Sequence, residues 1–352
     1  MRMPEYNLSP RTSNILYLSE QISPLDVTEL TEARIREYNR KEFSKNRIFK
    51  KLYRPVKRKV TQDLFIIPIE SGVSIYGTLF VKTKKAATDP TSLIIYIHDG
   101  GWMFGNMDKC SAICSNICAA TGSAVLSIDY RMAPEFKFPI PVYDCYNAFL
   151  WACQGARYWK LDTDKIYLLG SCAGGNLAAA VSRLARDKKG PVPAGLILID
   201  PITDCRLRTQ SIEKYKDHPI ISKKILSFYI NNYQREPKDI LDPLFSPLLA
   251  QDHSRLPETL IIASGQNPLS DDAHLYAQAL NSADSPAKII DCPQEIHNFI
   301  NYPISDRWKD TMQAISDFIR GRNVNSIDIL TKGERAIKEK PHVVGQRQSK
   351  DL

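Results

Sequence analysis

The chain has 352 residues, of which 43% are hydrophobic and 24% are charged, and its formal net charge is +8. This composition is typical of a globular protein with enough apolar material for one large core, and it excludes a disordered or fibrous chain. Because no run of about 18 apolar residues occurs and residues 1–20 lack a continuous apolar segment, we expect neither a membrane span nor a cleaved secretory signal.

We expect residues 1–60 to form helices and loops that precede the first strand. Within them, residues 40–59 hold ten lysines and arginines against the single acid Glu42, so this block accounts for the whole excess of positive charge. A basic block attracts nucleic acid or anionic lipid, but it more often forms the solvated face of a helix. No zinc-finger spacing or RNA-binding motif accompanies it, so we expect no nucleic-acid partner. Contact with a membrane surface through 40–59 is the less favoured alternative.

From residue 63 on, short apolar runs alternate with helical stretches. The runs 63–70 and 73–82, separated by Ser71-Gly72, predict a β-hairpin. Further strands are expected at 92–98, 124–129, 165–170, 194–200, 259–264 and 287–291, and helices at 108–121, 141–155, 174–187, 271–283 and 305–320. Runs that are apolar on both faces are typical of buried parallel strands. The alternation therefore predicts an α/β fold with a doubly wound, mostly parallel sheet.

Two later segments fall outside this alternation. Residues about 204–250 form an insertion that holds a helical piece at 222–233. Residues 323–352 are polar and charged with little periodicity, and we expect a flexible basic tail there. The globular domain is therefore expected over residues 61–322, with the insertion inside it.

Eight cysteines are too few for a disulfide scaffold in a chain of this length, and no CxxC pair occurs. Reduced thiols in a cytoplasm are the simplest interpretation. Cys110, Cys114 and Cys118 recur every four residues in an expected helix, which a metal or cluster site would also explain. No second set of ligands accompanies them, so we favour a buried stripe and predict no metal and no organic cofactor.

Residues 165–181, KIYLLGSCAGGNLAAAV, join an expected strand to an expected helix through small residues. The pattern Gly170-Ser171-Cys172-Ala173-Gly174 has the form of a nucleophile elbow, a strained turn with a reactive side chain at its centre. A glycine-rich turn of this kind can instead bind phosphate, but neither GxGxxG nor GxxxxGK[ST] is present. We interpret Cys172 as the candidate nucleophile.

Six motifs in the same order resemble those of the hormone-sensitive-lipase branch of the α/β-hydrolases, which includes small bacterial acetyl esterases. The resemblance runs from about residue 60 to 320. The motifs are His98-Asp99-Gly100-Gly101-Trp102 for HGGG[FW], DYRxAPE at 129–135, the elbow with Gly175, Ser246-Pro247-Leu248, Asn267-Pro268-Leu269-Ser270-Asp271 for DPLxD, and His297-Asn298-Phe299 for HGF. The resemblance implies an α/β-hydrolase fold, carboxylesterase activity on small acyl esters, and a helical cap formed by residues 1–60 and the insertion.

The departures from the family pattern lie at the reactive positions. Cys172 stands where the family has its nucleophilic serine, Asn267 where it has the triad aspartate, and Asp99 where it has the first glycine of HGGG. His297 matches the catalytic histidine. The family's oxyanion donors are backbone N–H groups that map to Gly100, Gly101 and Ala173, and all three positions are kept.

The cysteine and asparagine replacements are chemically consistent with each other. Asparagine in a serine triad costs about 10⁴ in turnover, but it suffices to orient the histidine in Cys-His-Asn proteases. A thiol has a pKa of about 8.5, which a helix N-terminus or an imidazolium lowers, so a resting thiolate–imidazolium pair is conceivable. The sequence thus predicts a Cys172–His297–Asn267 triad that hydrolyses an ester or thioester through an acyl-thioenzyme.

The alternative is a catalytically impaired hydrolase-fold protein that binds a ligand or partner, because two of the three triad positions are changed. Asp271, one helical turn beyond Asn267, is a candidate substitute acid. Ser171 is one position early in the elbow, so we do not expect it to be the nucleophile. The sequence leaves the acyl chain, the leaving group and the oligomeric state open.

Overall fold

The computed structural model describes residues 6–22, 27–43, 45–54, 60–69, 72–83 and 91–324. Within these ranges, eight strands form one sheet in the order β1-β2-β4-β3-β5-β6-β7-β8. The strands are β1 (Val60–Pro68), β2 (Ser74–Lys82), β3 (Thr91–Ile97), β4 (Ala124–Asp129), β5 (Leu161–Ser171), β6 (Gly195–Ile199), β7 (Thr259–Gln266) and β8 (Ala287–Ile296). Strand β2 pairs antiparallel with β1 and β4, and the pairs from β4 to β8 are parallel. The predicted mostly parallel sheet and its hairpin are confirmed.

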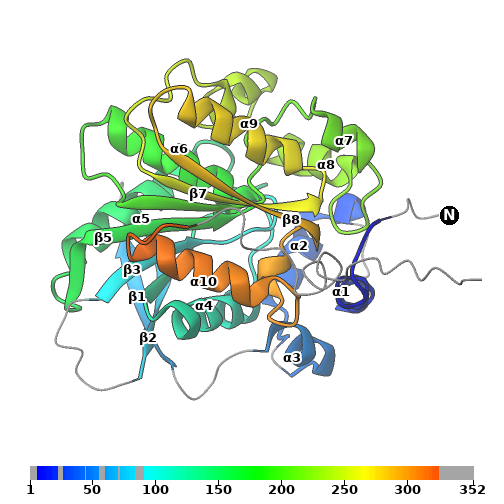
Figure 1. Ribbon diagram of the computed structural model, residues 1–352, viewed down its shortest axis with the longest axis horizontal. Coiled ribbons are helices and arrows are strands. Elements are labelled where there is room, and N and C mark those ends of the chain that lie inside the picture. The colour runs from blue at the N-terminus through cyan, green and yellow to red at the C-terminus, as the bar shows by residue number, and fades with distance from the viewer. Residues whose placement is uncertain are drawn as a thin grey trace, which may run out of the picture.

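Helices cover both faces of this sheet (Figure 1). On one face lie α5 (Ile140–Gly155), α6 (Ala173–Asp187) and α9 (Ser270–Asn281), and on the other lie α4 (Met107–Thr121) and α10 (Trp308–Ile319). The alternating side chains of β3 show why both layers are needed: Leu93, Ile95 and Ile97 pack into one buried apolar cluster, and Ile94 and Tyr96 into the other. The chain therefore has the doubly wound α/β fold that its strand pattern predicted.

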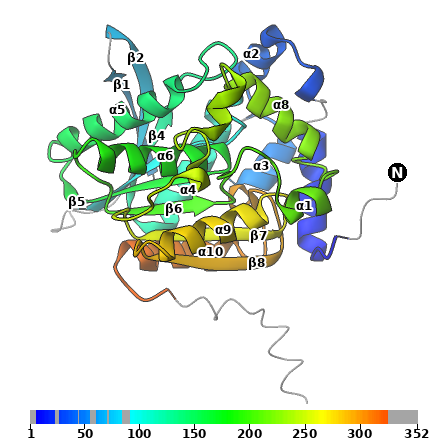
Figure 2. The same cartoon turned by 90° about the horizontal axis from the view of Figure 1, so that it is seen from above.

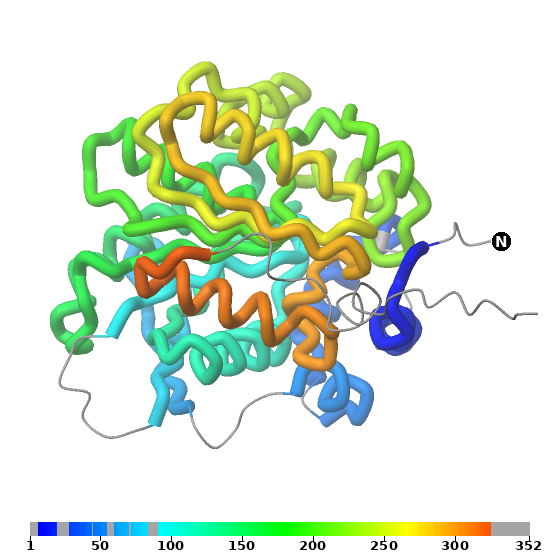
Figure 3. Tube along the Cα trace, viewed as in Figure 1, coloured from blue at the N-terminus to red at the C-terminus, as the bar shows by residue number. Residues whose placement is uncertain are grey.

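The N-terminal segment and the insertion lie at the same end of the molecule (Figures 2 and 3). The first contributes α1 (Pro10–Ile22), η1 (Val27–Glu29), α2 (Glu32–Arg40) and α3 (Arg47–Tyr53). The second contributes α7 (Gln210–Lys214), α8 (Lys223–Tyr233), η3 (Pro237–Leu241) and η4 (Pro247–Leu249), and a further short helix, η5 (Phe299–Asn301), follows β8. Helix α8 contacts η1, so segments far apart in the sequence meet there.

Specific polar contacts fasten the N-terminal segment to the α/β domain. The Arg36 guanidinium pairs with Glu135 of the DYRxAPE motif. The Thr12 hydroxyl donates to the buried Glu295 carboxylate at 3.2 Å, and the Asn39 amide donates to the Met103 carbonyl at 3.0 Å. These contacts join α1 and α2 to the α/β domain.

The basic block forms the exposed face of α3 where the structure describes it. Phe49, Leu52 and Tyr53 are buried, whereas Lys50 and Lys51 on the same helix are exposed. The residues of this block at 55–59, like the expected tail beyond residue 324, lie outside the described residues. No helix among the described residues is long and apolar enough to cross a membrane.

In α4, Cys114 and Cys118 are buried and Cys110 is partly exposed. In the part of the chain that the structure describes, no group of three or more histidine, cysteine or acidic side chains is placed to hold a metal ion.

Asn176 ties the first turns of α6 to the insertion, and its removal should destabilise the fold. Its buried side-chain amide donates to the carbonyls of Ile202 at 3.0 Å and Phe245 at 2.8 Å. Asn176→Ala leaves two buried acceptors without their donor, so we expect a loss of about 2–4 kcal/mol in the free energy of unfolding, measured by urea denaturation. Asn231→Ala, at an exposed position of α8, is the matched control and should change stability by less than about 0.5 kcal/mol. Equal losses in the two variants would contradict this account.

Candidate active site

Cys172 occupies a sharp turn between the end of β5 and the start of α6. Its backbone has φ 52° and ψ −115°, a conformation that costs energy for any residue with a side chain. Its N–H donates to the Ile199 carbonyl at 2.9 Å, and its carbonyl accepts from the Asn176 N–H at 3.0 Å. A Cβ added at Gly174 would lie 2.0 Å from the Ile97 carbonyl oxygen, so only glycine allows this close approach to β3. The local sequence thus builds the predicted elbow.

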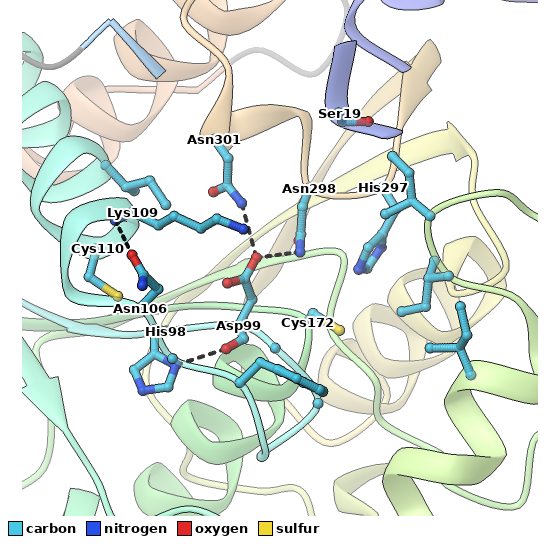
Figure 4. Close-up of a pocket in the computed structure, with 18 of the residues that line it drawn as sticks. Ser19, His98, Asp99, Asn106, Lys109, Cys110, Cys172, His297, Asn298 and Asn301 are labelled. Atoms are coloured by element: carbon cyan, nitrogen blue, oxygen red, sulfur yellow. Dashed lines mark hydrogen bonds between the residues drawn. The ribbon is translucent and has the colours of Figure 1, made fainter. Parts of the chain in front are cut away.

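Cys172 and His297 line one cavity of about 240 Å³. The N-terminal segment and the insertion supply part of its wall, including Leu30, Tyr38, Ile221 and Tyr229. Figure 4 shows Cys172 and His297 together with Asp99 around this cavity. Cys110 and Lys109 of α4 line it as well.

His297 follows β8 and is oriented by Asn267, which follows β7. The Nδ1 of His297 lies 3.1 Å from the Oδ1 of Asn267, which also accepts from the Leu269 N–H at 3.0 Å. Because an amide oxygen can only accept hydrogen bonds, this contact requires Nδ1 of His297 to carry the proton. Nε2 of His297 then carries the lone pair. This Nε2 is buried without a hydrogen-bond partner among the described residues. The structure therefore pairs His297 with Asn267, places His297 in the wall of the cavity that Cys172 also lines, and leaves Nε2 of His297 able to accept a proton.

A carboxylate that the sequence analysis did not identify lies beside this pair. Asp200 follows β6, is fully buried, and has φ 44°. One of its oxygens, Oδ2, lies 3.8 Å from Nδ1 of His297. The family pattern has its triad acid after β7, at the position of Asn267, and not after β6. The signal available was an aspartate directly after an apolar strand, where α/β proteins place functional side chains.

Asp271, the predicted substitute acid, is directed elsewhere. Its carboxylate accepts from the Ser211 N–H at 2.8 Å, at the start of α7. Among the described residues, no contact joins Asp271 to His297. Because its polar partner is Ser211, the prediction that Asp271 replaces the triad acid finds no support in the geometry of the described residues.

Asp99, in place of a family glycine, faces the cavity and is held by two amides. Its Oδ2 accepts from Asn298 at 2.6 Å and from Asn301 at 3.0 Å (Figure 4). The same Asn298 side chain accepts a hydrogen bond from the Ser171 hydroxyl. Ser171 is therefore engaged by Asn298, in agreement with the expectation that it is not the nucleophile.

Burial sets the protonation of the reactive pair. It raises the pKa of Cys172, an effect that the Asp99 carboxylate reinforces and the Ala173 N–H opposes. Burial also lowers the pKa of His297 to about 4, although Asp99 acts in the opposite direction. Both shifts favour a neutral thiol and a neutral imidazole at neutral pH. The thiolate–imidazolium pair considered from the sequence is disfavoured because both charges would be desolvated.

Two of the three expected oxyanion donors line the same cavity, and the third directly follows Cys172 in the chain. Gly100 and Gly101 line it, and Ala173 is the first residue of α6. Gly101 has φ 61°, and a Cβ there would lie 2.1 Å from the Tyr229 ring of α8. The loop that carries these glycines is therefore packed directly under the insertion.

Comparison with known proteins agrees with this architecture. Residues 94–301 match the family described as alpha/beta hydrolase fold. The chain is 37% identical over 224 residues to an arylesterase of Saccharolobus solfataricus, covering 62% of this chain and 72% of that protein. It is 28% identical over 228 residues to an ethyl acetate hydrolase of Pseudomonas putida, covering 63% and 72%.

A solved structure shows the same likeness over most of the chain. It is an esterase of Pyrobaculum calidifontis, which is 28% identical with a TM-score of 0.78 and covers 90% of this chain and 100% of that one. The family match spans more than half of this chain, and both the fold and the order of the motifs agree with it. The chain therefore belongs to the α/β-hydrolase family, in the branch that resembles hormone-sensitive lipase and includes enzymes of the carboxylesterase type.

Proposed function

We propose that this chain is a carboxylic-ester or thioester hydrolase that acts on small acyl esters through Cys172, His297 and Asn267. The observation that carries the proposal is the shared cavity: Cys172 and His297 line it together, and Asn267 orients His297, whose Nε2 has no hydrogen-bond partner in the described part of the chain. The esterase relatives support the ester-hydrolase class of reaction, which the relatives' names assign to those proteins.

In the proposed reaction, Nε2 of His297 takes the thiol proton as Sγ of Cys172 attacks the ester carbonyl carbon. The backbone N–H groups of Gly100, Gly101 and Ala173 stabilise the resulting oxyanion, with about 3 kcal/mol expected from each donor. When the tetrahedral intermediate collapses, His297 protonates the leaving alkoxide or thiolate. Water, deprotonated by His297, then attacks the acyl carbon, the C–S bond breaks to release the carboxylic acid, and His297 returns the proton to the sulfur of Cys172.

We also propose that residues 1–60 and the insertion at 204–250 act as a cap over the site. Residues from both segments line the cavity, and a volume of about 240 Å³ suits a short acyl group. Water exclusion by such a cap strengthens the electrostatic interactions at the reacting atoms.

All eight cysteines are free thiols, which is consistent with the predicted cytoplasmic location.

A second candidate is a hydrolase-fold protein that binds a ligand or partner without turnover. The observation that favours it is the carboxylate of Asp99, which faces the cavity and raises the pKa of Cys172 further. Ester binding without acylation of Cys172 would identify this case.

The proposed intermediate is an acyl group on Cys172. After brief incubation with nitrophenyl acetate, mass spectrometry of peptides should find an acetyl group on Cys172. Cys172→Ala should lose both the adduct and turnover above background, because the attacking sulfur is gone. Cys110→Ser is the matched control: it removes the other described cysteine that lines the cavity and should keep the Cys172 adduct. An adduct confined to Cys110, or turnover that persists in Cys172→Ala, would contradict the mechanism.

The acid limb of the pH profile should follow the pKa of His297. Its base form is required for proton transfer, and burial lowers the pKa to about 4, so activity is lost only as the pH falls through that value. We expect kcat/KM for nitrophenyl acetate to decline below about pH 4 and to stay level from about pH 5 to 7. An acid limb near the ordinary histidine pKa of about 6.5 would show that His297 is solvated or is not the base.

A further inference from the structure

We propose that Asp200 supplies the negative charge of the triad, while Asn267 supplies only the hydrogen bond that orients His297. The two roles that one aspartate fills in the family pattern are then divided between two strands, β6 and β7. This inference rests on the proposed function, and Asp200 acts through His297 as a positioning residue.

The position of Asp200 relative to the imidazole is the first observation. Its Oδ2 lies 3.8 Å from Nδ1 of His297, and both side chains are buried. Oδ1 of Asn267 lies closer to Nδ1, at 3.1 Å, so the amide oxygen accepts the hydrogen bond from His297 and the carboxylate lies beyond hydrogen-bond distance. A carboxylate at this separation in a buried site favours the imidazolium that forms when His297 takes the thiol proton.

The hydrogen bonds to Asp200 are the second observation. It accepts from the Ser264 N–H at 2.7 Å, the Ser264 hydroxyl at 2.7 Å and the Asn298 N–H at 2.8 Å. Burial raises the pKa of Asp200, and these donors oppose the rise by stabilising the ionised form. Hydrogen bonds donated to a carboxyl group favour its ionised form, which is the form that the proposal requires of Asp200.

The Asn267 amide links the two groups. Its nitrogen is buried and has no hydrogen-bond partner within the described ranges, yet the Asn267 side chain also opposes the pKa rise of Asp200. Oδ1 of Asn267 is used by His297 and Leu269, so the NH₂ group of the amide is the part that can interact with the Asp200 carboxylate. Asn267 therefore interacts with both the imidazole of His297 and the carboxyl group of Asp200.

The charged and titratable groups around His297 come from four other segments. They are Asp99 after β3, Cys172 at the elbow, Asp200 after β6 and His218 in the loop before α8. Asp99 is held by Asn298 and Asn301 on the cavity side, and burial with His297 nearby lowers the pKa of His218 to about 3. Asp200 is the group of these four that faces Nδ1, the atom whose proton must be retained in the transition state.

The decisive experiment removes the carboxylate after β6 by Asp200→Asn and introduces one after β7 by Asn267→Asp. Acylation of Cys172 by nitrophenyl acetate is measured in the wild type, in Asp200→Asn and in the double variant Asp200→Asn with Asn267→Asp. We expect Asp200→Asn to slow acylation at least tenfold and the double variant to recover to within about threefold of the wild type. Asp200→Asn acylation within twofold of the wild type, or a double variant as slow as Asp200→Asn, would overturn the proposal.

Asp272→Asn is the matched control for the structural role. Asp272 is equally buried and also accepts from two backbone N–H groups and a hydroxyl, those of Thr203 and Asp204. Its loss should lower the melting temperature as much as Asp200→Asn does, without moving the acid limb of the pH profile. An acid limb that shifts equally in both variants would overturn the specific role of Asp200.

A titration that needs no turnover separates this proposal from the proposed function. Asn267→Asp should raise the pKa of His297 into a range that NMR can follow, and adding Asp200→Asn should lower it again by at least one unit. If the wild type forms no acyl adduct but this shift is seen, the proposed function fails and the placement of the charge stands. A His297 pKa that does not respond to Asp200→Asn in the Asn267→Asp background would refute the proposal.

Discussion

The site depends on the backbone turn at Cys172. Strand β5 must pass into α6 within one residue while α6 packs against β3, and the positive φ of Cys172 with a glycine two residues on makes that possible. The turn places the sulfur at the start of a helix, in a cavity that the N-terminal segment and the insertion help to enclose. The same packing removes water from the sulfur and from His297. That desolvation, more than any single contact, decides how the two groups can react.

Desolvation points to proton transfer during attack instead of a preformed ion pair. A thiol can react through a general base, and the imidazole of His297, whose Nε2 has no hydrogen-bond partner among the described residues, can accept its proton. The helix N-terminus and the Ala173 N–H favour the thiolate but do not outweigh burial and the nearby Asp99 carboxylate. The chemistry of a cysteine in this fold therefore need not follow that of cysteine proteases with a resting thiolate.

Two of the departures from the family pattern, Asp99 and Asn267, are connected with Asp200 through the loop that carries His297. Asn298 donates through its side chain to Asp99 and through its backbone to Asp200, and Asp200 in turn lies beside His297. Asp99, Asn267 and Asp200 thus surround one histidine loop. A change at any of these positions alters the electrostatic surroundings of His297.

The fold was largely predictable from the sequence, and the site only in part. Apolar runs such as 194–200 and 259–264 are buried on both faces, so their composition alone marks them as parallel strands. The elbow and the histidine were predictable because glycine spacing and residue type are local signals. Asp200 was not, since its role arises from the meeting of β6, β7 and β8, and no local pattern records that one carboxylate lies 3.8 Å from a given imidazole. The engagement of Asp271 by Ser211 is likewise set by the insertion and not by helical spacing.

The most direct test is a crystal structure of the protein after reaction with a short-chain acylating agent. The account predicts continuous density between Sγ of Cys172 and the acyl carbon, the acyl oxygen within hydrogen-bond distance of the N–H groups of Gly100, Gly101 and Ala173, and Nε2 of His297 facing the sulfur. Density on another residue, or an acyl group on Cys172 with the imidazole turned away, would contradict it.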